Sequence, residues 1–200
     1  GAVKWAVDQK LADPAKVAIY GGSYGGYSTL VGLTFTPTTF ACAVDIVGPS
    51  NLETLLGTIP PYWEAGKKQM YSRMGDPTTE EGKAILRAAS PLYKADQIVR
   101  PLLIGQGANE PRVKQAESDQ IVKAMQAKGL PVSYVLFPDE GHGFAKPNNR
   151  IGCNAVAEAF LGHCLGGRVE PLGETVRQST AQIVQGAEHV PGLADAAQKK

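Results

Sequence analysis

Short runs of consecutive apolar residues alternate along the chain with longer stretches in which apolar residues recur at a helical spacing. Continuous apolar runs are typical of strands buried on both faces of a parallel sheet, and the helical spacing indicates amphipathic helices. The apolar runs predict strands at 17–20, 40–47, 101–105 and 132–137. The helical spacing predicts helices at 2–11, 28–35, 63–74, 114–128 and 154–165. Strands and helices in alternation predict an α/β protein with a parallel sheet flanked by helices.

The segment 48–90 interrupts this alternation. Short helical stretches at 51–56 and 76–86 are separated by breaks such as the Pro-Pro pair at 60–61. Irregular helical insertions at the ends of parallel strands often build the substrate pocket of an α/β enzyme. We therefore expect this segment to lie beside the functional site.

Beyond residue 165 the apolar periodicity fades, and glycine, proline and polar residues dominate. We predict that residues 1–165 form one domain. Residues 166–200 are predicted to be a C-terminal extension that is partly extended over the surface and disordered at 196–200.

The composition fits a globular protein with a sizeable hydrophobic core. Of 200 residues, 43% are hydrophobic, and 20 basic residues nearly balance 19 acidic ones. Without a basic cluster, nucleic acids and acidic membrane surfaces are not predicted partners. No apolar run approaches the length of a membrane span, and the first residues lack the features of a signal peptide. The chain is predicted to be soluble, in the cytoplasm or the periplasm.

The three cysteines, Cys42, Cys153 and Cys164, are odd in number and widely spaced. They form no C-x-x-C motif, so we expect small buried apolar residues rather than a disulfide framework or a zinc site. The three histidines are too scattered for a metal motif. No metal or cofactor is predicted.

The strongest chemical signal surrounds Ser23. Gly21 and Gly25 flank it in a G-x-S-x-G pattern, with a predicted strand before it and a predicted helix after it. Such a sharp strand-to-helix turn exposes a nucleophilic serine and needs neighbours without side-chain bulk. The N–H groups at the start of the helix would point towards an oxyanion formed there. The bare pattern can arise by chance in a glycine-rich chain, but its position between strand and helix favours a nucleophile elbow.

A serine nucleophile needs a base to accept its proton and a carboxylate to orient that base. Glu110 follows the strand predicted at 101–105, and His142 lies between two glycines after the strand predicted at 132–137. The order serine, acid, histidine is that of α/β-hydrolases, and all three residues would lie at one edge of the sheet. The alternative is that His142 is a solvent-exposed loop residue. Three other acids in these loops, Glu117, Asp119 and Asp139, are alternatives to Glu110 as the orienting acid, and any acid here could simply be solvated.

Several segments taken together carry a resemblance. They are the glycine-rich segment 21–27, Ser-Pro-Leu at 90–92 with the strand at 101–104, Glu-Pro-Arg-Val at 110–113, Gly-His-Gly-Phe at 141–144, and the stretch 165–171. In this order they resemble the catalytic domain of the prolyl oligopeptidase family of serine peptidases, over about residues 1–195. The last stretch is similar to the ending of bacterial dipeptidyl or acylaminoacyl peptidases. Residues 1–165 would then be part of an α/β-hydrolase catalytic domain.

The resemblance implies roles for particular residues. Ser23 would be the nucleophile, His142 the general base and acid, and the backbone N–H of Tyr24 an oxyanion donor. Glu110 stands where the family normally has aspartate, and Gln106 stands where it commonly has histidine. Glutamate can serve as the orienting acid, but its extra methylene moves the carboxylate, and a shift of about 1 Å can cost about a hundredfold in rate.

Three further residues match substrate-binding positions of the family. Arg112 would hold the carbonyl of the second residue before the scissile bond, and Val113 and Trp63 would line the pocket for the first. From the residues alone, Arg112 could equally be a surface ion-pair partner, and Trp63 a core residue.

The resemblance also implies that family features are missing from this sequence. The early strands of the hydrolase sheet, the second oxyanion donor and the β-propeller that typically precedes the domain are not found in it. The sequence therefore resembles the C-terminal part of a longer peptidase. A sheet with an open edge strand is expected to pair with the remainder of its parent chain, another subunit or a swapped copy.

We predict a serine hydrolase that cleaves short peptides through an acyl-enzyme on Ser23, with no cofactor. Two alternatives stay open. One is an esterase on the same scaffold, since sheet and triad do not distinguish amide from ester. The other is a catalytically silent fragment with a role in binding or assembly.

Overall fold

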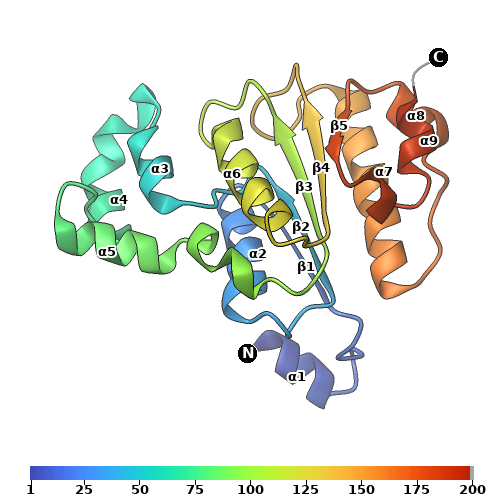
Figure 1. Cartoon of the computed structure of the whole chain (residues 1–200), viewed down its shortest axis with the longest axis horizontal. Helices are drawn as coiled ribbons and strands as arrows, with labels where there is room; N and C mark the ends of the chain where they lie inside the picture. Colours follow the sequence, from blue (N-terminus) through green and yellow to red (C-terminus); the bar gives the residue numbers. More distant parts are fainter. Residues whose placement is uncertain (199–200) are drawn as a thin grey trace.

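A mostly parallel sheet forms the centre of the computed structural model, which describes residues 1–198 (Figure 1). Its strands are β1 (Ala18–Gly22), β2 (Cys42–Ile46), β3 (Leu102–Gly107), β4 (Val132–Phe137) and β5 (Gln182–Gln185), and they lie in that order. The strands β1 to β4 run parallel, and β5 pairs antiparallel with β4. The predicted α/β architecture is confirmed.

Helices connect the strands and cover both faces of the sheet (Figure 1). The α-helices are α1 (Ala2–Asp8), α2 (Tyr24–Phe35), α3 (Leu52–Gly57), α4 (Lys67–Met74), α5 (Glu80–Ala89), α6 (Gln115–Gln126), α7 (Pro147–Leu165), α8 (Gly173–Arg177) and α9 (Leu193–Ala197). Short 3-10 helices are η1 (Pro61–Gly66), η2 (Pro91–Gln97) and η3 (Ala187–His189). Each connection between parallel strands contains a helix, as parallel pairing requires. Within residues 1–198, no helix combines the length and apolarity needed to cross a bilayer.

Two apolar cores, one on each face of the sheet, hold the layers together. On one face, α2 and α6 bury residues such as Leu30 and Ile121. On the other face, α7 buries Phe160. Neighbouring residues of β3 point to different cores, Leu102 to the first and Leu103 to the second. Because both faces are covered, the central strands are apolar throughout, which is why uninterrupted apolar runs predicted them.

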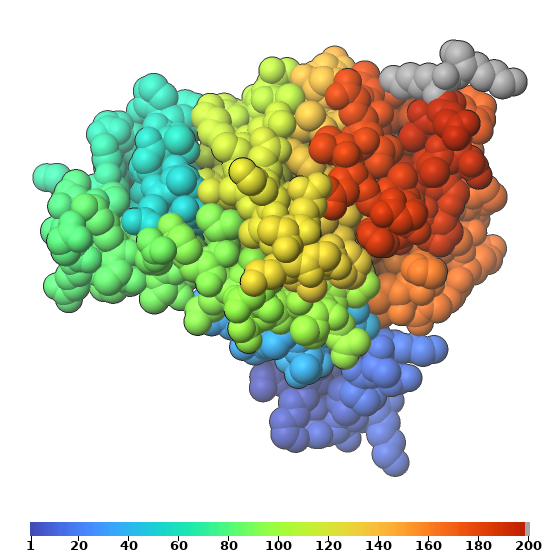
Figure 2. Space-filling model, in the orientation of Figure 1, coloured from blue at the N-terminus to red at the C-terminus, as the bar shows by residue number. Residues whose placement is uncertain are grey.

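The segment after β2 forms a helical lobe at one end of the molecule (Figures 1 and 2). Its apolar cluster consists of Leu52, Leu55, Leu56, Leu86 and Val113. Since Val113 belongs to the loop after β3, the cluster joins the lobe to the carboxyl end of the sheet. The expected irregular insertion beside the strand ends is therefore present. The helix predicted at 63–74 is divided into η1 and α4.

The segment from Leu172 to α9 is integral to the fold, and the prediction of a surface extension is wrong for it. β5 extends the sheet beside β4, and α8 packs against α7 and α9. Leu172, Val176 and Leu193 are buried in the core beneath α7. These elements are too short to show a period, so their burial depends on contacts with residues distant in the sequence. Ala196, predicted to be disordered, is 3% exposed within α9, and positions 199–200 of that prediction lie outside the described residues.

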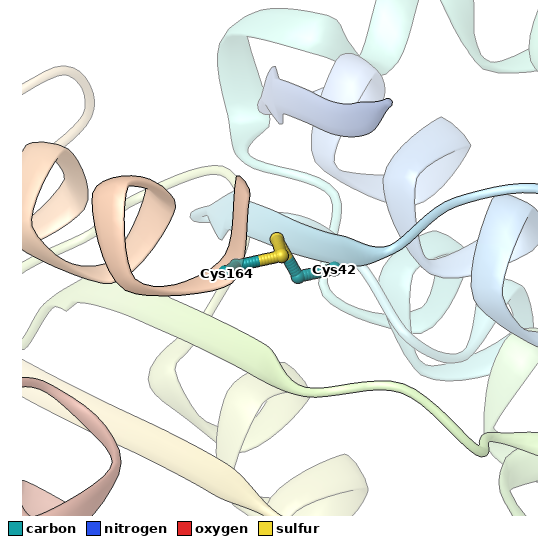
Figure 3. Close-up of a disulfide and its surroundings, with 2 residues drawn as sticks. All are labelled: Cys42 and Cys164. Carbon is teal, nitrogen blue, oxygen red and sulfur yellow. A yellow bond between two sulfur atoms is a disulfide. The ribbon is translucent and has the colours of Figure 1, made fainter. Parts of the chain in front are cut away.

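A disulfide joins Cys42 on β2 to Cys164 near the end of α7 (Figure 3). The prediction that the cysteines would be unpaired is therefore wrong for these two. They are 122 positions apart in the sequence, and packing of α7 against the sheet brings them together. Cys153 agrees with the prediction, since it is buried and unpaired, and burial raises the pKa of its thiol to about 12.

Removal of the disulfide in a Cys42→Ala, Cys164→Ala double variant should lower the free energy of unfolding by about 2–5 kcal/mol, because the bond closes a long loop in the unfolded chain. Urea unfolding measures this loss, with Cys153→Ala as the control for a cysteine outside the bond. In unreduced, denatured protein one thiol should react with a thiol reagent, and all three should react after reduction. Three reactive thiols before reduction would contradict the pairing.

Candidate active site

Ser23 occupies a strained turn between β1 and α2. Its φ of 57° and ψ of −122° lie in a region that residues with a side chain rarely adopt. The turn is held by a hydrogen bond from the Ser23 N–H to the carbonyl of Ile46 on β2, 2.8 Å long. A Cβ on Gly21 would lie 2.2 Å from the carbonyl oxygen of Gly25, so strand and helix can approach this closely only with glycine. This geometry agrees with the nucleophile elbow predicted from the pattern.

The N-terminus of α2 directly follows Ser23. Tyr24 is the first residue of the helix, and its N–H has no intrahelical acceptor because it belongs to the first turn. The helix dipole adds partial positive charge at this end. An oxyanion next to Ser23 would therefore meet both an N–H donor and a favourable field.

His142 and Glu110 are brought together from the loops after β4 and β3. His142 Nδ1 lies 2.5 Å from Glu110 Oε2. The other carboxylate oxygen, Oε1, accepts hydrogen bonds from the N–H groups of Arg112 at 2.7 Å and Val113 at 3.3 Å. The Glu110 side chain is fully buried, and that of His142 is 20% exposed. Both oxygens of the buried carboxylate are thus in use, one to hold the imidazole and one to hold the loop.

The other candidate acids have different partners. Glu117 accepts hydrogen bonds from the N–H groups of Ser50 and Asn51. Asp119 accepts one from the hydroxyl of Tyr134, and Asp139 is paired with Lys146. Of the four acids, Glu110 is the one in contact with His142.

The loop that carries His142 crosses the end of β3. The N–H of Asn109, after β3, donates to the carbonyl of Glu140, after β4, at 2.9 Å. Further along, Ile46 and Phe144 both lie next to the position that a Cβ on Gly105 would occupy. Since Ile46 also accepts the hydrogen bond from Ser23, these contacts connect the elbow with the His142 loop.

Ser23 and His142 share no hydrogen bond in the part of the chain that the structure describes. Catalytic hydrogen bonds are often long without substrate and tighten when substrate binds. The structure therefore brings together the predicted acid and base, and it places the predicted nucleophile at the same edge of the sheet.

Two of the three predicted substrate-binding residues are neighbours. The guanidinium carbon of Arg112 lies 5.7 Å from the centre of the Trp63 ring. Arg112 Nε donates to the hydroxyl of Tyr62 at 3.4 Å, and the Tyr62 and Trp63 rings meet edge to face. Val113 is instead buried in the apolar cluster of the lobe, where 3% of its surface is exposed.

Gln106, at the position where the family resemblance leads one to expect histidine, has a structural role. Its amide donates to the carbonyls of Gly107 at 3.0 Å and Val113 at 3.1 Å, and it accepts from Ser118 Oγ at 2.8 Å. These bonds tie the loop of Glu110 to the end of β3 and to α6.

Asp45, which no sequence pattern singled out, lies on β2 beneath the elbow. Its Oδ1 occupies the space where a Cβ on Gly26 or on Gly48 would be, 2.2 Å from each of those positions. The side chain is fully buried, and neither oxygen has a hydrogen-bond partner among the described residues. Burial raises the pKa of this carboxyl to about 7, and the nearby N–H of Gly48 offsets part of the rise without forming a hydrogen bond.

This raised pKa should make the fold less stable as pH rises. An acid with a pKa of 3.8 when exposed and about 7 when folded favours the folded state below pH 4, and that advantage is lost between about pH 4 and pH 7. Asp45→Asn cannot ionise, so its stability relative to the unchanged protein should rise by roughly 4 kcal/mol from pH 4 to pH 8. Urea unfolding at several pH values measures the difference, and a constant difference would contradict the assignment.

In the described residues, no cluster of three or more His, Cys, Asp or Glu side chains could hold a metal ion.

A model of the prolyl oligopeptidase family matches residues 1–168. The chain belongs to this family. It is 65% identical over 195 residues to dipeptidyl aminopeptidase BIII of Pseudoxanthomonas mexicana, covering 98% of this chain and 28% of that protein. It is 52% identical to dipeptidyl peptidase family member 6 of Caenorhabditis elegans, covering 91% of this chain and 25% of that protein. The chain thus spans about a quarter of the length of these prolyl oligopeptidase family relatives.

Solved structures of the prolyl oligopeptidase family share the fold. A puromycin-hydrolyzing peptidase of Mycobacterium tuberculosis superposes with a TM-score of 0.75 at 32% identity, over 85% of this chain and 25% of that one. An acylaminoacyl peptidase of Pyrococcus horikoshii gives a TM-score of 0.73 at 24% identity, over 85% of this chain and 27% of that one, which shows the fold alone. The sheet is therefore of the α/β-hydrolase type, as predicted.

Proposed function

We propose that this chain carries the nucleophile, base and orienting acid of a serine peptidase that cleaves short peptides. The observation that carries the proposal is the 2.5 Å contact between Glu110 Oε2 and His142 Nδ1, at the sheet edge where Ser23 occupies its strained turn. A carboxylate held at Nδ1 leaves Nε2 as the nitrogen that can accept the serine proton. Membership of the prolyl oligopeptidase family and the dipeptidyl peptidase names of two relatives support a peptide as substrate.

In the proposed reaction, His142 Nε2 accepts the proton of Ser23 as Oγ attacks the carbonyl carbon of the substrate. Negative charge then develops on the carbonyl oxygen, where the N–H of Tyr24 and the dipole of α2 stabilise it. The imidazolium gives its proton to the leaving amine as the C–N bond breaks, which leaves an acyl group on Ser23. Water then gives a proton to the same imidazole as its oxygen attacks the acyl carbon. The bond from that carbon to Oγ breaks, Oγ takes the proton from the imidazolium, and the acyl group leaves as a carboxylic acid.

Arg112 and Trp63 are proposed to contact the substrate near the scissile bond. Their side chains lie side by side, and Arg112, two positions after Glu110 in the sequence, donates its backbone N–H to the Glu110 carboxylate. A guanidinium is a strong donor to a carbonyl, and an indole offers apolar area with a rigid shape. Val113 is proposed to back the same pocket from within the apolar cluster of the lobe.

Two substrate classes and one probe test this function against its alternatives. Dipeptidyl p-nitroanilides should be turned over, and a fluorophosphonate should label Ser23. Activity towards short-chain p-nitrophenyl esters alone would favour an esterase. Absence of both labelling and turnover would favour a catalytically silent fragment with a role in binding or assembly.

We also propose that the chain works in an oxidising compartment, such as the periplasm. The disulfide between Cys42 and Cys164 supports this, because such bonds persist outside the reducing cytosol. Of the two compartments considered from the sequence, the cytoplasm is therefore the less favoured. Recovery of the native protein from fractionated cells would test the proposal. We expect the bond to be formed in protein from the periplasmic fraction and absent in protein from the cytosolic fraction.

A further inference from the structure

The loop between β4 and α7 is fastened by side chains that take no part in the proposed reaction. We infer that Glu140, Asn149 and Thr180, here called the loop clamp, are positioning residues that hold His142 against Glu110. This inference rests on the proposed function, because it concerns the base of the triad. It rests on hydrogen bonds, burial and backbone geometry around the loop.

Glu140 closes the loop that carries His142. Its carboxylate accepts hydrogen bonds from the N–H groups of Ala145 at 2.8 Å and Lys146 at 2.9 Å. The side chain is buried, so water does not compete for these bonds. One side chain thus joins the two ends of the loop 141–144, and the loop cannot open without breaking both bonds.

The loop needs such a constraint because its backbone is strained. Gly143 has a φ of +91° and Phe144 a φ of +53°, which is an unfavourable region for a phenylalanine. Residues stay in such conformations only when their surroundings over-determine them. Phe144 is held by burial against Phe137, with ring centres 4.6 Å apart, and the loop clamp holds the chain on the other side. Without the clamp, the loop should relax and move the His142 ring relative to Glu110.

Asn149 connects Glu140 to the C-terminal segment. Its amide nitrogen donates to Glu140 Oε1 at 2.9 Å and to Asp139 at 3.1 Å. Its amide oxygen accepts from the N–H of Thr180 at 2.8 Å and the hydroxyl of Thr180 at 3.0 Å. Thr180 lies between α8 and β5 and also contacts Asp139 through its hydroxyl. An unbroken chain of hydrogen bonds therefore leads from the C-terminal segment to the loop of His142.

A purely structural role makes a different prediction. Glu140 bonds the two residues that precede α7, so the same contacts would also stabilise the start of that helix through its dipole. If that were all, loss of the clamp would lower stability and leave the imidazole and kcat unchanged. The readout must therefore follow His142 itself as well as the melting of the protein.

The test combines kinetics with NMR of the imidazole. Glu140→Gln places an amide donor against the N–H group of either Ala145 or Lys146. The kcat for a dipeptidyl p-nitroanilide should therefore fall about 10- to 100-fold, while KM should change less than about twofold. Thr180→Val removes the hydroxyl at nearly constant volume and should lower kcat several-fold, and Thr180→Ser should restore it. Solvent exchange of the His142 Nδ1 proton should quicken about tenfold or more in Glu140→Gln. His163 and His189, the other two histidines, serve as internal references whose ring signals should not change.

Ser133→Ala is the matched control. Ser133 lies near the start of β4, and its buried hydroxyl donates to the carbonyl of Gly186 at 2.8 Å, far along the strand from the loop. The Ser133→Ala variant should have a lower melting temperature but the same kcat and the same exchange rate of the His142 Nδ1 proton as the unchanged protein. The inference would be overturned if Glu140→Gln and Ser133→Ala lowered the melting temperature equally and Glu140→Gln left the exchange rate of the His142 Nδ1 proton unchanged. If the unchanged protein neither labels at Ser23 nor turns over substrate, the proposed function fails, and the exchange measurement still decides the loop clamp.

Discussion

Replacing Ser23 by alanine is expected to lower kcat by about 10⁴- to 10⁶-fold and to abolish labelling by a fluorophosphonate. No other group is proposed to form the acyl-enzyme, so the effect on turnover should be near complete. The backbone of Ser23, with φ of 57° and ψ of −122°, is set by β1 and α2. Its hydroxyl makes no hydrogen bond within residues 1–198, so the alanine variant should keep the melting temperature of the unchanged protein. Mass spectrometry of intact protein measures the labelling.

Ser28→Ala is the control for this variant. Ser28 lies on the exposed side of α2 and bonds through its hydroxyl to the carbonyl of Tyr24 at 3.2 Å. Its loss should leave labelling and turnover essentially unchanged. Persistent labelling of Ser23→Ala would show that the nucleophile is elsewhere in the chain.

The second large effect is expected for Glu110→Gln, which should lower kcat by about 10⁴-fold. Glutamine keeps an oxygen to accept the N–H of Arg112, now 2.7 Å from Glu110 Oε1. Its NH₂ group then faces Nδ1 of His142 and donates to it. Nδ1 becomes an acceptor, so the proton moves to Nε2 and the ring can no longer take the proton of Ser23. A pre-steady-state measurement of acylation on an activated ester would report this loss directly.

Glu117→Gln separates this tautomer effect from loss of stability. Glu117 is also a buried carboxylate that accepts two backbone N–H groups, from Ser50 at 3.0 Å and Asn51 at 2.9 Å. It has no contact with His142, so its variant should lose comparable stability and retain most of the acylation rate. Equal losses of acylation in both variants would remove Glu110 from its proposed role.

The proposed orienting acid, Glu110, shows how far sequence reasoning reaches. The pattern favours Glu110 because it follows a strand, and it leaves Glu117, Asp119 and Asp139 as alternatives. The contact with His142 distinguishes Glu110 from them. Sequence position gives the strand end from which a side chain starts, but the reach of the loop and the direction of the side chain depend on what packs around them.

The disulfide and the C-terminal segment show where sequence reasoning stops. Cys42 and Cys164 have no spacing motif, and their pairing depends on how α7 crosses the sheet. β5 and α8 have four and five residues, so no periodicity could show that they are buried or paired. The contacts of Thr180 with Asn149 and Asp139 likewise join polar residues that are 31 and 41 positions apart in the chain.

The amino-acid sequence by itself determined the α/β class, the strands β1 to β4 and the turn at Ser23, because each of them requires a recognisable pattern of residues that are close together in the sequence. Buried strands need uninterrupted apolar runs, and a tight strand-to-helix turn needs glycine beside the serine. Tertiary structure alone decided the Cys42–Cys164 bond, the burial of the C-terminal segment, the isolated carboxyl of Asp45 and the contact between Glu110 and His142. These features depend on contacts between residues far apart in the chain, whose free energy exists only once the layers have packed.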